Sequence, residues 1–434
     1  MPQLIFLSFL SFLIIFSCLS YASVTIFPIS IIEIAIGVMF LFWLTRMAYR
    51  KRITLEKTGL LFPAVLFLGL VTFQLIPLPI DFIKTLSFNT AFLYEKFSAH
   101  QTDGHQFFLS IYPNSTLAEL LKLSAFICLF FLVINNIASK RQAGIIINLI
   151  IAFGLCVSIF GLIKKYADLS SRSFGPFVNR NNFAGYINLI IPLALGFSLT
   201  EMPLSKRLIY GVSICVMILA LFMSASRAGV LIFVFNLLLF LFFTQLKDGL
   251  RKKIPILYLW FFIGVCFFIF FLNSKTVWIR LGSLFDRNTY IFLGHGYSWL
   301  DILRICKDFP IFGIGLGTFG SISYMYKTTL VQASFSYAHN DYLQLFSEVG
   351  LLGFVSAVLF FVLYFKSVIN NWLRRHDTYV IGLVLGGMTS IIGMLIYSAL
   401  DFNLQIPAIA LLFFIILGFT FRLTTLGNSH EVSK

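Results

Sequence analysis

The stretch S-Y-A-H-N-D-Y-L-Q-L-F-S-E-V-G-L-L-G, residues 336–353, places a polar cluster directly ahead of an apolar segment. The cluster contains an ionisable ring, an amide and two carboxylates: His339, Asn340, Asp341 and Glu348. In a strongly apolar chain, such groups at the entrance of a membrane segment mark a pathway or a site more often than not. The alternative is a polar cap at a membrane boundary, with Tyr342 as an interfacial anchor. We favour the functional interpretation.

The composition defines the surroundings of this stretch. Of the 434 residues, 59% are hydrophobic and 11% are charged, against about 25% charged residues in a soluble domain. Apolar runs of about 20 residues, the length that spans a bilayer, recur along the whole chain. The sequence therefore predicts an all-α, polytopic membrane protein that forms a single membrane domain over residues 1–434.

Twelve apolar segments are predicted to be membrane spans. They cover residues 4–21, 24–44, 60–76, 117–137, 144–163, 183–200, 208–224, 229–246, 255–272, 350–366, 379–399 and 404–421. The N-terminal segment lacks a basic region and a small-residue cleavage site, so we expect a retained first span and not a signal peptide.

The charge distribution predicts the orientation. Basic residues cluster in short loops after the second, fourth, sixth, eighth and tenth spans, which the positive-inside rule assigns, with both termini, to the cytoplasm. This placement explains the net charge of +15, and no basic face with interleaved aromatic residues indicates nucleic acid as a partner. Three long loops, 77–116, 164–182 and 273–346, therefore lie on the outer side, and loops this long are commonly functional.

The longest loop carries two local patterns. Residues 297–308 have the apolar spacing of an amphipathic helix that lies on the membrane surface. Residues 313–320, G-I-G-L-G-T-F-G, spell G-x-G-x-x-G, but no βαβ unit surrounds them. That fingerprint means little without its strand and helix, so we predict a tight turn that returns the chain toward the membrane.

Arg227 lies in S-A-S-R-A-G-V, at the turn between the seventh and eighth spans. Arginine is costly in or near the bilayer. One interpretation is a structural arginine whose head group reaches the interface. The other is an anion receptor, because the planar guanidinium matches phosphate oxygens.

The loop 164–182 carries more positive charge than the outer side normally does. It supplies four candidate binding residues, Arg172, Asn179, Arg180 and Asn182. An anionic head group would compensate this charge, and lipid phosphate in general is the alternative.

Candidate groups for proton transfer are few. His339 has no nearby cysteine or second close histidine, so it is a poor metal ligand but a suitable proton acceptor. His100 and His105 are too loosely spaced to predict a metal site, and no metal or other cofactor is expected. Asp401 lies in an outer turn on the same side as His339 and is predicted to support it. Glu33, in the second span, is either a proton-relay group or the partner of an interior cation.

Four motifs, in this order, resemble those of the O-antigen ligase superfamily, which includes O-antigen ligases, O-antigen and exopolysaccharide polymerases, and protein O-oligosaccharyltransferases. They are G-P-F-V-N-R-N-N-F-A-G-Y at 175–186, S-A-S-R-A-G at 224–229, W-L-D-I-L-R-I-C-K-D-F-P-I-F-G-I-G-L-G-T-F at 299–319 and A-H-N-D-Y-L-Q-L-F-S-E-V-G-L-L-G at 338–353. The resemblance covers roughly residues 110–420, and the ordered set is more specific than any single motif.

The resemblance implies a GT-C-like glycosyltransferase of the bacterial inner membrane that acts on the periplasmic face, in lipopolysaccharide or exopolysaccharide biosynthesis. Such enzymes pass a glycan from undecaprenyl diphosphate to an acceptor hydroxyl, without a metal. The acceptor stays open. It is lipid A–core for a ligase, the growing polymer for a polymerase, or a protein side chain for an oligosaccharyltransferase.

The resemblance also implies roles for individual residues. His339 matches the family histidine of the long loop, and Arg227 matches the arginine after the seventh span. His295 stands where the family usually has a second arginine, and Arg280, Arg287 or neither takes over that role. In chemical terms, arginines would stabilise the departing diphosphate and His339 would deprotonate or orient the acceptor hydroxyl for inverting attack. The remaining predicted substrate-binding residues are Arg172, Asn179, Arg180, Asn182, Asn340, Tyr342 and Asp401.

The alternative from another class is a transporter or a flippase of lipid-linked glycans, which twelve spans and Glu33 would suit. Such proteins commonly carry an internal repeat, with polar groups in both halves. Here the polar residues gather on one predicted face, and no half-to-half similarity is visible. We therefore favour glycan transfer.

Overall fold

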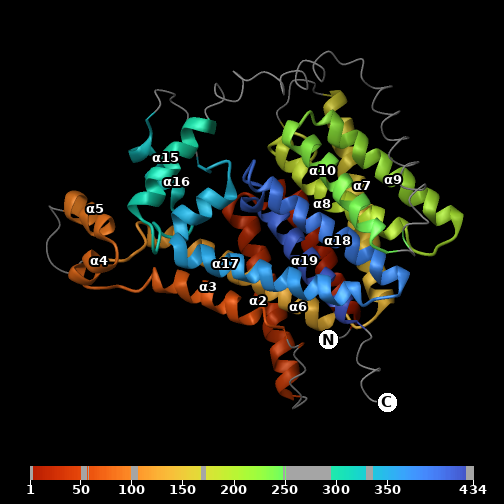
Figure 1. The fold of residues 1–434 in the computed structure, drawn as a ribbon, viewed down its shortest axis with the longest axis horizontal. Helices are drawn as coiled ribbons and strands as arrows, with labels where there is room; N and C mark the ends of the chain where they lie inside the picture. Colours follow the sequence, from red (N-terminus) through yellow and green to blue (C-terminus); the bar gives the residue numbers. More distant parts are fainter. Residues whose placement is uncertain are drawn as a thin grey trace. The chain divides into compact units, whose positions relative to one another are not determined.

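The computed structural model describes residues 3–49, 56, 58–98, 106–167, 173–247, 250, 295–328 and 336–426. This described part contains 15 α-helices and no strand (Figure 1). The predicted all-α class is therefore confirmed.

Eight of the described helices are long and apolar enough to cross a membrane. They are α2 (Ile26–Tyr49), α6 (Pro113–Asn136), α7 (Lys140–Ala167), α9 (Leu204–Met223), α10 (Arg227–Gln245), α17 (Asp341–Leu373), α18 (Thr378–Tyr397) and α19 (Pro407–Thr425). The helices α1 (Gln3–Leu19) and α3 (Leu61–Phe73) are apolar but shorter. The chain is thus a multi-pass membrane protein. Of the twelve predicted spans, only 255–272 lies outside the described residues, and each of the others coincides with a helix.

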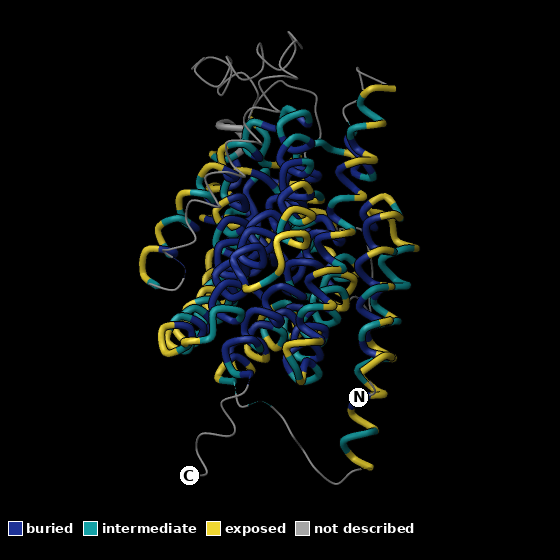
Figure 2. The backbone as a smooth tube through the Cα atoms, turned by 90° about the vertical axis from the view of Figure 1, so that its right-hand side faces the viewer, coloured by how far each residue is buried: buried dark blue, intermediate teal, exposed yellow. Residues whose placement is uncertain are grey.

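The helix α8 (Arg180–Ser198) has a polar first turn and a fully buried body. Every residue from Asn182 to Ser198 is buried, which is the pattern of a core helix and not of a lipid-facing one. Figure 2 shows this contrast between helices: some stretches are buried over most of their length, and others carry exposed residues at every turn. The element α8 is therefore the centre around which its neighbours pack.

The chain divides into two compact units. Unit 1 comprises Met1–Glu56, Cys128–Phe285 and Ser367–Lys434, and unit 2 comprises Lys57–Ile127 and Asp286–Lys366. The helices α6 and α17 contribute residues to both units.

In unit 1, α8 packs closely against α18 through glycines. A Cβ added to Gly196 would lie 3.1 Å from the Cα of Gly386, and one added to Gly386 would lie 2.9 Å from the Cα of Leu193. Small residues let the backbones of membrane helices approach this closely. Larger side chains at either glycine would push the two helices apart.

Pro192 interrupts the hydrogen bonding of α8. Proline has no N–H, so the carbonyl of Asn188, four residues earlier, loses its helical donor. The side-chain amide of Asn236, in α10, donates to that carbonyl over 3.5 Å, and the hydroxyl of Ser390, in α18, donates to the carbonyl of Leu189. Asn236 therefore supplies a donor to the carbonyl that Pro192 leaves without one, and Ser390 adds a donor at the next carbonyl.

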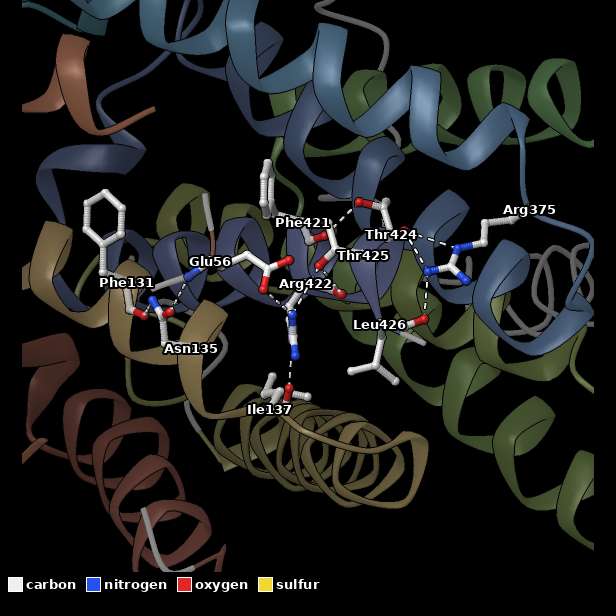
Figure 3. A network of polar contacts seen from close by, with 10 residues as sticks. All are labelled: Glu56, Phe131, Asn135, Ile137, Arg375, Phe421, Arg422, Thr424, Thr425 and Leu426. Carbon is white, nitrogen blue, oxygen red and sulfur yellow. Dashed lines mark hydrogen bonds and ion pairs between the residues drawn. The ribbon is translucent and has the colours of Figure 1, made fainter. Parts of the chain in front are cut away.

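A second polar network in unit 1 connects the end of α19 with residues near the ends of other helices (Figure 3). The guanidinium of Arg422, in the last turn of α19, contacts the Glu56 carboxylate at 2.8 Å and donates to the Ile137 carbonyl at 2.8 Å. The Arg375 guanidinium donates to the Thr424 carbonyl at 2.7 Å. The last carbonyls of a helix have no partner within the helix, and arginine side chains can donate to them. Arg375 therefore caps the C-terminus of α19.

Unit 2 adds four shorter helices to α3 and to parts of α6 and α17. They are α4 (Ile80–Leu86), α5 (Phe88–Ser98), α15 (His295–Asp308) and α16 (Phe319–Tyr326). The first two lie in the predicted loop 77–116 and the others in the predicted loop 273–346. Ile302 and Ile305 of α15 are buried against Phe319 and Ile322 of α16. One apolar side of α15 is therefore packed against protein, whereas Leu300 and Leu303 are 56% and 50% exposed. The location of α15 on the membrane surface stays a prediction.

The glycine run after α15 forms the turn that its sequence indicates. Gly313, Gly315 and Gly317 all have positive φ, at 71°, 108° and 75°, a backbone conformation that favours glycine. Hydrogen bonds hold this turn in unit 2: the Gly315 amide donates to the Glu348 carbonyl at 2.9 Å, and the Gln74 side chain donates to the Phe312 carbonyl at 2.6 Å.

Candidate functional site

In unit 1, the helices α8 and α10 begin side by side. Arg180 is the first residue of α8, and Arg227 is the first residue of α10. The hydroxyl of Ser226 donates to the side-chain oxygen of Asn181 over 2.9 Å, so the first turns of the two helices are joined. Both arginines are half-buried. The two guanidinium-bearing residues therefore start neighbouring helices at the same end of unit 1.

Local sequence explains where these two helices begin. The side chain of Asn179 accepts a hydrogen bond from the Asn181 amide at 2.9 Å, and the Ser226 hydroxyl accepts one from the Gly229 amide at 3.2 Å. Asparagine and serine are among the best N-cap residues because their oxygens satisfy first-turn amides. Asn179, predicted to bind substrate, is thus engaged as the cap of α8.

Two helix N-termini and two arginines make this end of unit 1 electropositive. Each N-terminus carries roughly half a positive charge and has amides without a helical partner. Such an arrangement binds anions such as phosphate. The Asn182 side chain is buried, and its oxygen has no hydrogen-bond partner within the described part of the chain.

The C-terminus of α18 completes this cluster. The hydroxyl of Tyr397 lies 3.3 Å from the Ser226 hydroxyl and donates to the Asn181 carbonyl at 3.2 Å. Asp401 follows in the next turn. Its carboxylate is buried and accepts a hydrogen bond from the Phe402 amide at 3.0 Å. Tyr397 is buried and contacts the first turns of α8 and α10, and it lies one turn before Asp401, the carboxylate predicted to support His339.

In unit 2, His339 occupies a strained turn before α17. Its φ of 49° is in the left-handed region, which is uncommon for a residue other than glycine. The side chain is half-buried, between the buried residues Ala338 and Asn340. Strain of this kind persists only where the surroundings hold it, and it gathers at functional sites.

Asn340 caps α17, and this explains why the helix begins at Asp341, ahead of the predicted span 350–366. Its side-chain oxygen accepts hydrogen bonds from the amides of Tyr342 at 3.1 Å and Leu343 at 3.0 Å. Gly350, with φ 61° and ψ −168°, then breaks the helical geometry just before the apolar part. The predicted polar entrance is therefore a separate short helical segment.

A chain of hydrogen bonds leads from Glu348 to the turn of His339. The carboxylate of Glu348 is buried and accepts from the Gln344 side-chain amide at 3.1 Å and from the Phe319 amide at 3.3 Å. The side-chain oxygen of Gln344 accepts in turn from the Ala338 amide at 3.0 Å. Gln344 thus connects a buried carboxylate with the residue that precedes His339.

A second acidic residue of unit 2 approaches this region. Glu119, in α6, forms an ion pair with Lys122 at 2.6 Å. Burial, followed by the charges of Glu119 and Glu348, raises the pKa of the Tyr337 hydroxyl. Tyr337 therefore stays neutral near its two carboxylate neighbours.

The structure distributes the predicted site residues as follows. Unit 1 brings together Arg227, Asn179, Arg180, Asn182 and Asp401, and unit 2 brings together His339, Asn340 and Tyr342. His295 is the first residue of α15. Arg172, Arg280 and Arg287 lie outside the described residues. No three histidine, cysteine, aspartate or glutamate side chains are arranged to hold a metal ion in the part of the chain that the structure describes.

The structure adds residues that sequence reasoning left out of the site. Asn181, Ser226 and Tyr397 join three helix ends, and Gln344 bridges Glu348 and the His339 turn. Ser226 stands just ahead of the apolar run that begins at Ala228, a placement typical of an N-cap, which would have identified it. No local pattern indicates Tyr397 or Gln344, because their partners are distant or lie in an irregular turn.

Residues 212–358 match the family model described as O-antigen ligase. The match includes Arg227 and His339 and confirms the predicted resemblance to the O-antigen ligase superfamily. A comparison with curated proteins finds no match.

Proposed function

We propose that this chain is a membrane glycosyltransferase that moves a glycan from an undecaprenyl-diphosphate-linked donor to an acceptor hydroxyl. The family match over residues 212–358 supports an O-antigen ligase or polymerase type of function in general. The observation that carries the finer proposal is the bond between Ser226 and Asn181, which holds two arginine-bearing helix N-termini together.

The donor is bound through its diphosphate in this proposal. Arg180 and Arg227, with the first-turn amides of α8 and α10, supply positive charge where the leaving group departs. A sugar diphosphate already carries a good leaving group, so electrostatic stabilisation of the diphosphate matters more than a general acid. Asn182, whose buried side-chain oxygen has no partner among the described residues, serves in this proposal as a hydrogen-bond acceptor for a sugar hydroxyl of the donor.

His339 acts on the acceptor. The acceptor oxygen attacks the anomeric carbon and its proton passes to His339, while the bond from that carbon to the diphosphate oxygen breaks. The product is the glycosylated acceptor with inverted anomeric configuration, and undecaprenyl diphosphate leaves. The left-handed backbone at His339 and the cap at Asn340 support a fixed direction of the imidazole.

The proposal includes the membrane orientation. We place the protein in the bacterial inner membrane with both termini in the cytoplasm and the site at the periplasmic face, because the basic loops follow the even-numbered spans. Lipid A–core and the growing polymer are both acceptors of the required chemistry, a saccharide hydroxyl at the membrane surface. A protein hydroxyl is the third choice.

The test is transfer by the purified protein in lipid nanodiscs, with an undecaprenyl-diphosphate-linked glycan and candidate acceptors. Arg227→Ala and His339→Ala should each remove most of the activity. Arg207→Ala is the matched control, since Arg207 lies in the first turn of α9, away from the end that leads to Ser226. Full activity in both site variants would refute the site.

The same material separates transfer from transport. In sealed vesicles, a flippase would move the labelled lipid-linked glycan between leaflets without forming product. Such movement in the absence of transfer would overturn the proposal.

Arg280→Ala and Arg287→Ala, assayed in parallel, decide which arginine, if either, serves in place of His295.

A further inference from the structure

We propose that Gln344 and Glu348 are positioning residues that set the direction of the His339 imidazole. This inference rests on the proposed function, in which His339 receives the proton of the acceptor hydroxyl. It concerns two side chains that do not need to touch the substrate.

The turn is held from both sides. On one side, the Ala338 amide donates to the Gln344 side-chain oxygen at 3.0 Å. On the other side, the Asn340 side chain caps α17, and the Asn340 carbonyl accepts from the backbone N–H of Gln344 at 3.0 Å. His339 therefore lies between two residues that are each fixed by a hydrogen bond to the following helix. This restraint stabilises its left-handed φ of 49°.

Without a partner for its NH2 group, the side-chain amide of Gln344 could rotate. The hydrogen bond to Glu348 prevents this rotation. The Glu348 carboxylate accepts from the Gln344 side chain at 3.1 Å, which fixes which end of the amide faces Ala338. The Glu348 side chain is 2% exposed, so this hydrogen bond does not compete with bulk water. The carboxylate thus selects the amide orientation that the His339 turn requires.

Glu348 is itself anchored at its backbone. Its carbonyl accepts from the Gly315 amide at 2.9 Å and from the Gln74 side chain at 2.9 Å. Its carboxylate also accepts from the Phe319 amide at 3.3 Å. The chain of contacts therefore runs from Gln74, just after α3, and the glycine turn, through Glu348 and Gln344, to the residue before His339. Supporting residues of this kind keep a reacting group in its productive geometry.

The variants are chosen to test direction and not merely folding. Gln344→Met removes both hydrogen bonds at nearly constant volume. Gln344→Glu places a second acceptor against Glu348, so the two carboxylates repel each other. The double variant Gln344→Glu with Glu348→Gln restores a donor and an acceptor between the two positions. Gln142→Met is the matched control, because buried Gln142 also accepts from a backbone amide, that of Ala138, at 2.7 Å, but in unit 1.

In the transfer assay, kcat of Gln344→Met should fall on the order of 10- to 100-fold, the effect of misplacing a reacting group. The KM for the donor should be unchanged. Gln344→Glu should be worse, and the double variant should recover activity relative to it. A loss of kcat no larger than that of Gln142→Met would overturn the inference. So would a double variant as inactive as Gln344→Glu.

Failure of this inference is distinguishable from failure of the proposed function. If His339→Ala retains full transfer activity, the proposed site is wrong and the positioning role falls with it. If His339→Ala is inactive and Gln344→Met is fully active, only the positioning role is wrong. If Gln344→Met does not fold, the comparison of Gln344→Glu with the double variant decides the matter.

Discussion

The hydroxyl of Ser226 and the side-chain oxygen of Asn181 lie 2.9 Å apart and are hydrogen-bonded. The same hydroxyl caps α10 by accepting from the Gly229 amide at 3.2 Å. One serine therefore fixes the start of one helix and attaches it to the start of another. Arg180 and Arg227 are the first residues of the two helices that this contact joins.

Replacing Ser226 by alanine should weaken both the fold and donor binding. The change removes an N-cap and a side-chain bond, with a cost of about 1–2 kcal/mol. Thermal unfolding in detergent should show a lower midpoint, and the KM for the diphosphate-linked donor should rise. Ser213→Ala is the control, since that hydroxyl only donates to the Ile209 carbonyl in its own helix. Equal midpoints for the two variants would contradict the expectation.

Asn236 and Pro192 should be energetically coupled. Asn236→Ala leaves the Asn188 carbonyl without its side-chain donor, whereas Pro192→Ala returns a backbone amide to that carbonyl. In the Pro192→Ala variant, Asn236→Ala should therefore reduce the free energy of unfolding by about 0.5–1 kcal/mol less than in the wild type. This is the size typical of interhelical hydrogen bonds in membranes. A double-mutant cycle from denaturant unfolding measures this difference. Additive costs would show that Asn236 does not compensate the proline.

Gly350→Ala should destabilise unit 2. Gly350 has φ 61° and ψ −168°, and an added Cβ would lie 2.6 Å from the Phe312 amide nitrogen. This backbone region is essentially restricted to glycine, so the strain alone costs about 1–3 kcal/mol. Gly69→Ala is the control, because open space surrounds Gly69 inside α3 and alanine favours helix there. Gly350→Ala should lower the midpoint temperature of thermal unfolding, and Gly69→Ala should not. Equal midpoint shifts in the two variants would refute this explanation.

Cys306 should make stability decrease at alkaline pH. Burial raises the pKa of its thiol from 9.0 to about 11, so the fold prefers the neutral form. The stabilisation is complete below pH 9 and is lost as the pH rises through 9 toward 11, since the unfolded chain releases the proton first. The midpoint of wild type minus that of Cys306→Ala should therefore fall over this pH range. A constant difference between pH 8 and pH 11 would show that the thiol is not coupled to folding.

The helices were largely predictable because their signal is local. The apolar runs at 144–163 and 379–399 coincide with α7 and α18 (Figure 1). Helix starts were less predictable where a cap lies outside the apolar run. The helix α17 begins at Asp341 because the Asn340 side chain caps it. Hydropathy does not predict such a helix start, because the cap is a hydrogen bond outside the apolar run.

The candidate site was predictable in its residue types and less so in its geometry. Arg227 and His339 were identified from motifs, and the family match includes both. The side-chain oxygens of Asn179 and Asn340 are used in helix caps. Substrate binding by these two residues stays a prediction. Tyr397 could not be identified, since its bond to Asn181 joins residues far apart in the chain.

The sequence by itself determined that this protein is a bundle of membrane helices with polar clusters near residues 180, 227 and 339. Run length, charge placement and motif order are properties of short segments, and they need no knowledge of packing. Only the tertiary structure decided that Ser226 meets Asn181, that Asn236 serves the backbone freed by Pro192, and that Gln344 links Glu348 to Ala338. Each of these contacts depends on which helices and turns pack together, and that follows from the whole chain burying its apolar surface at once.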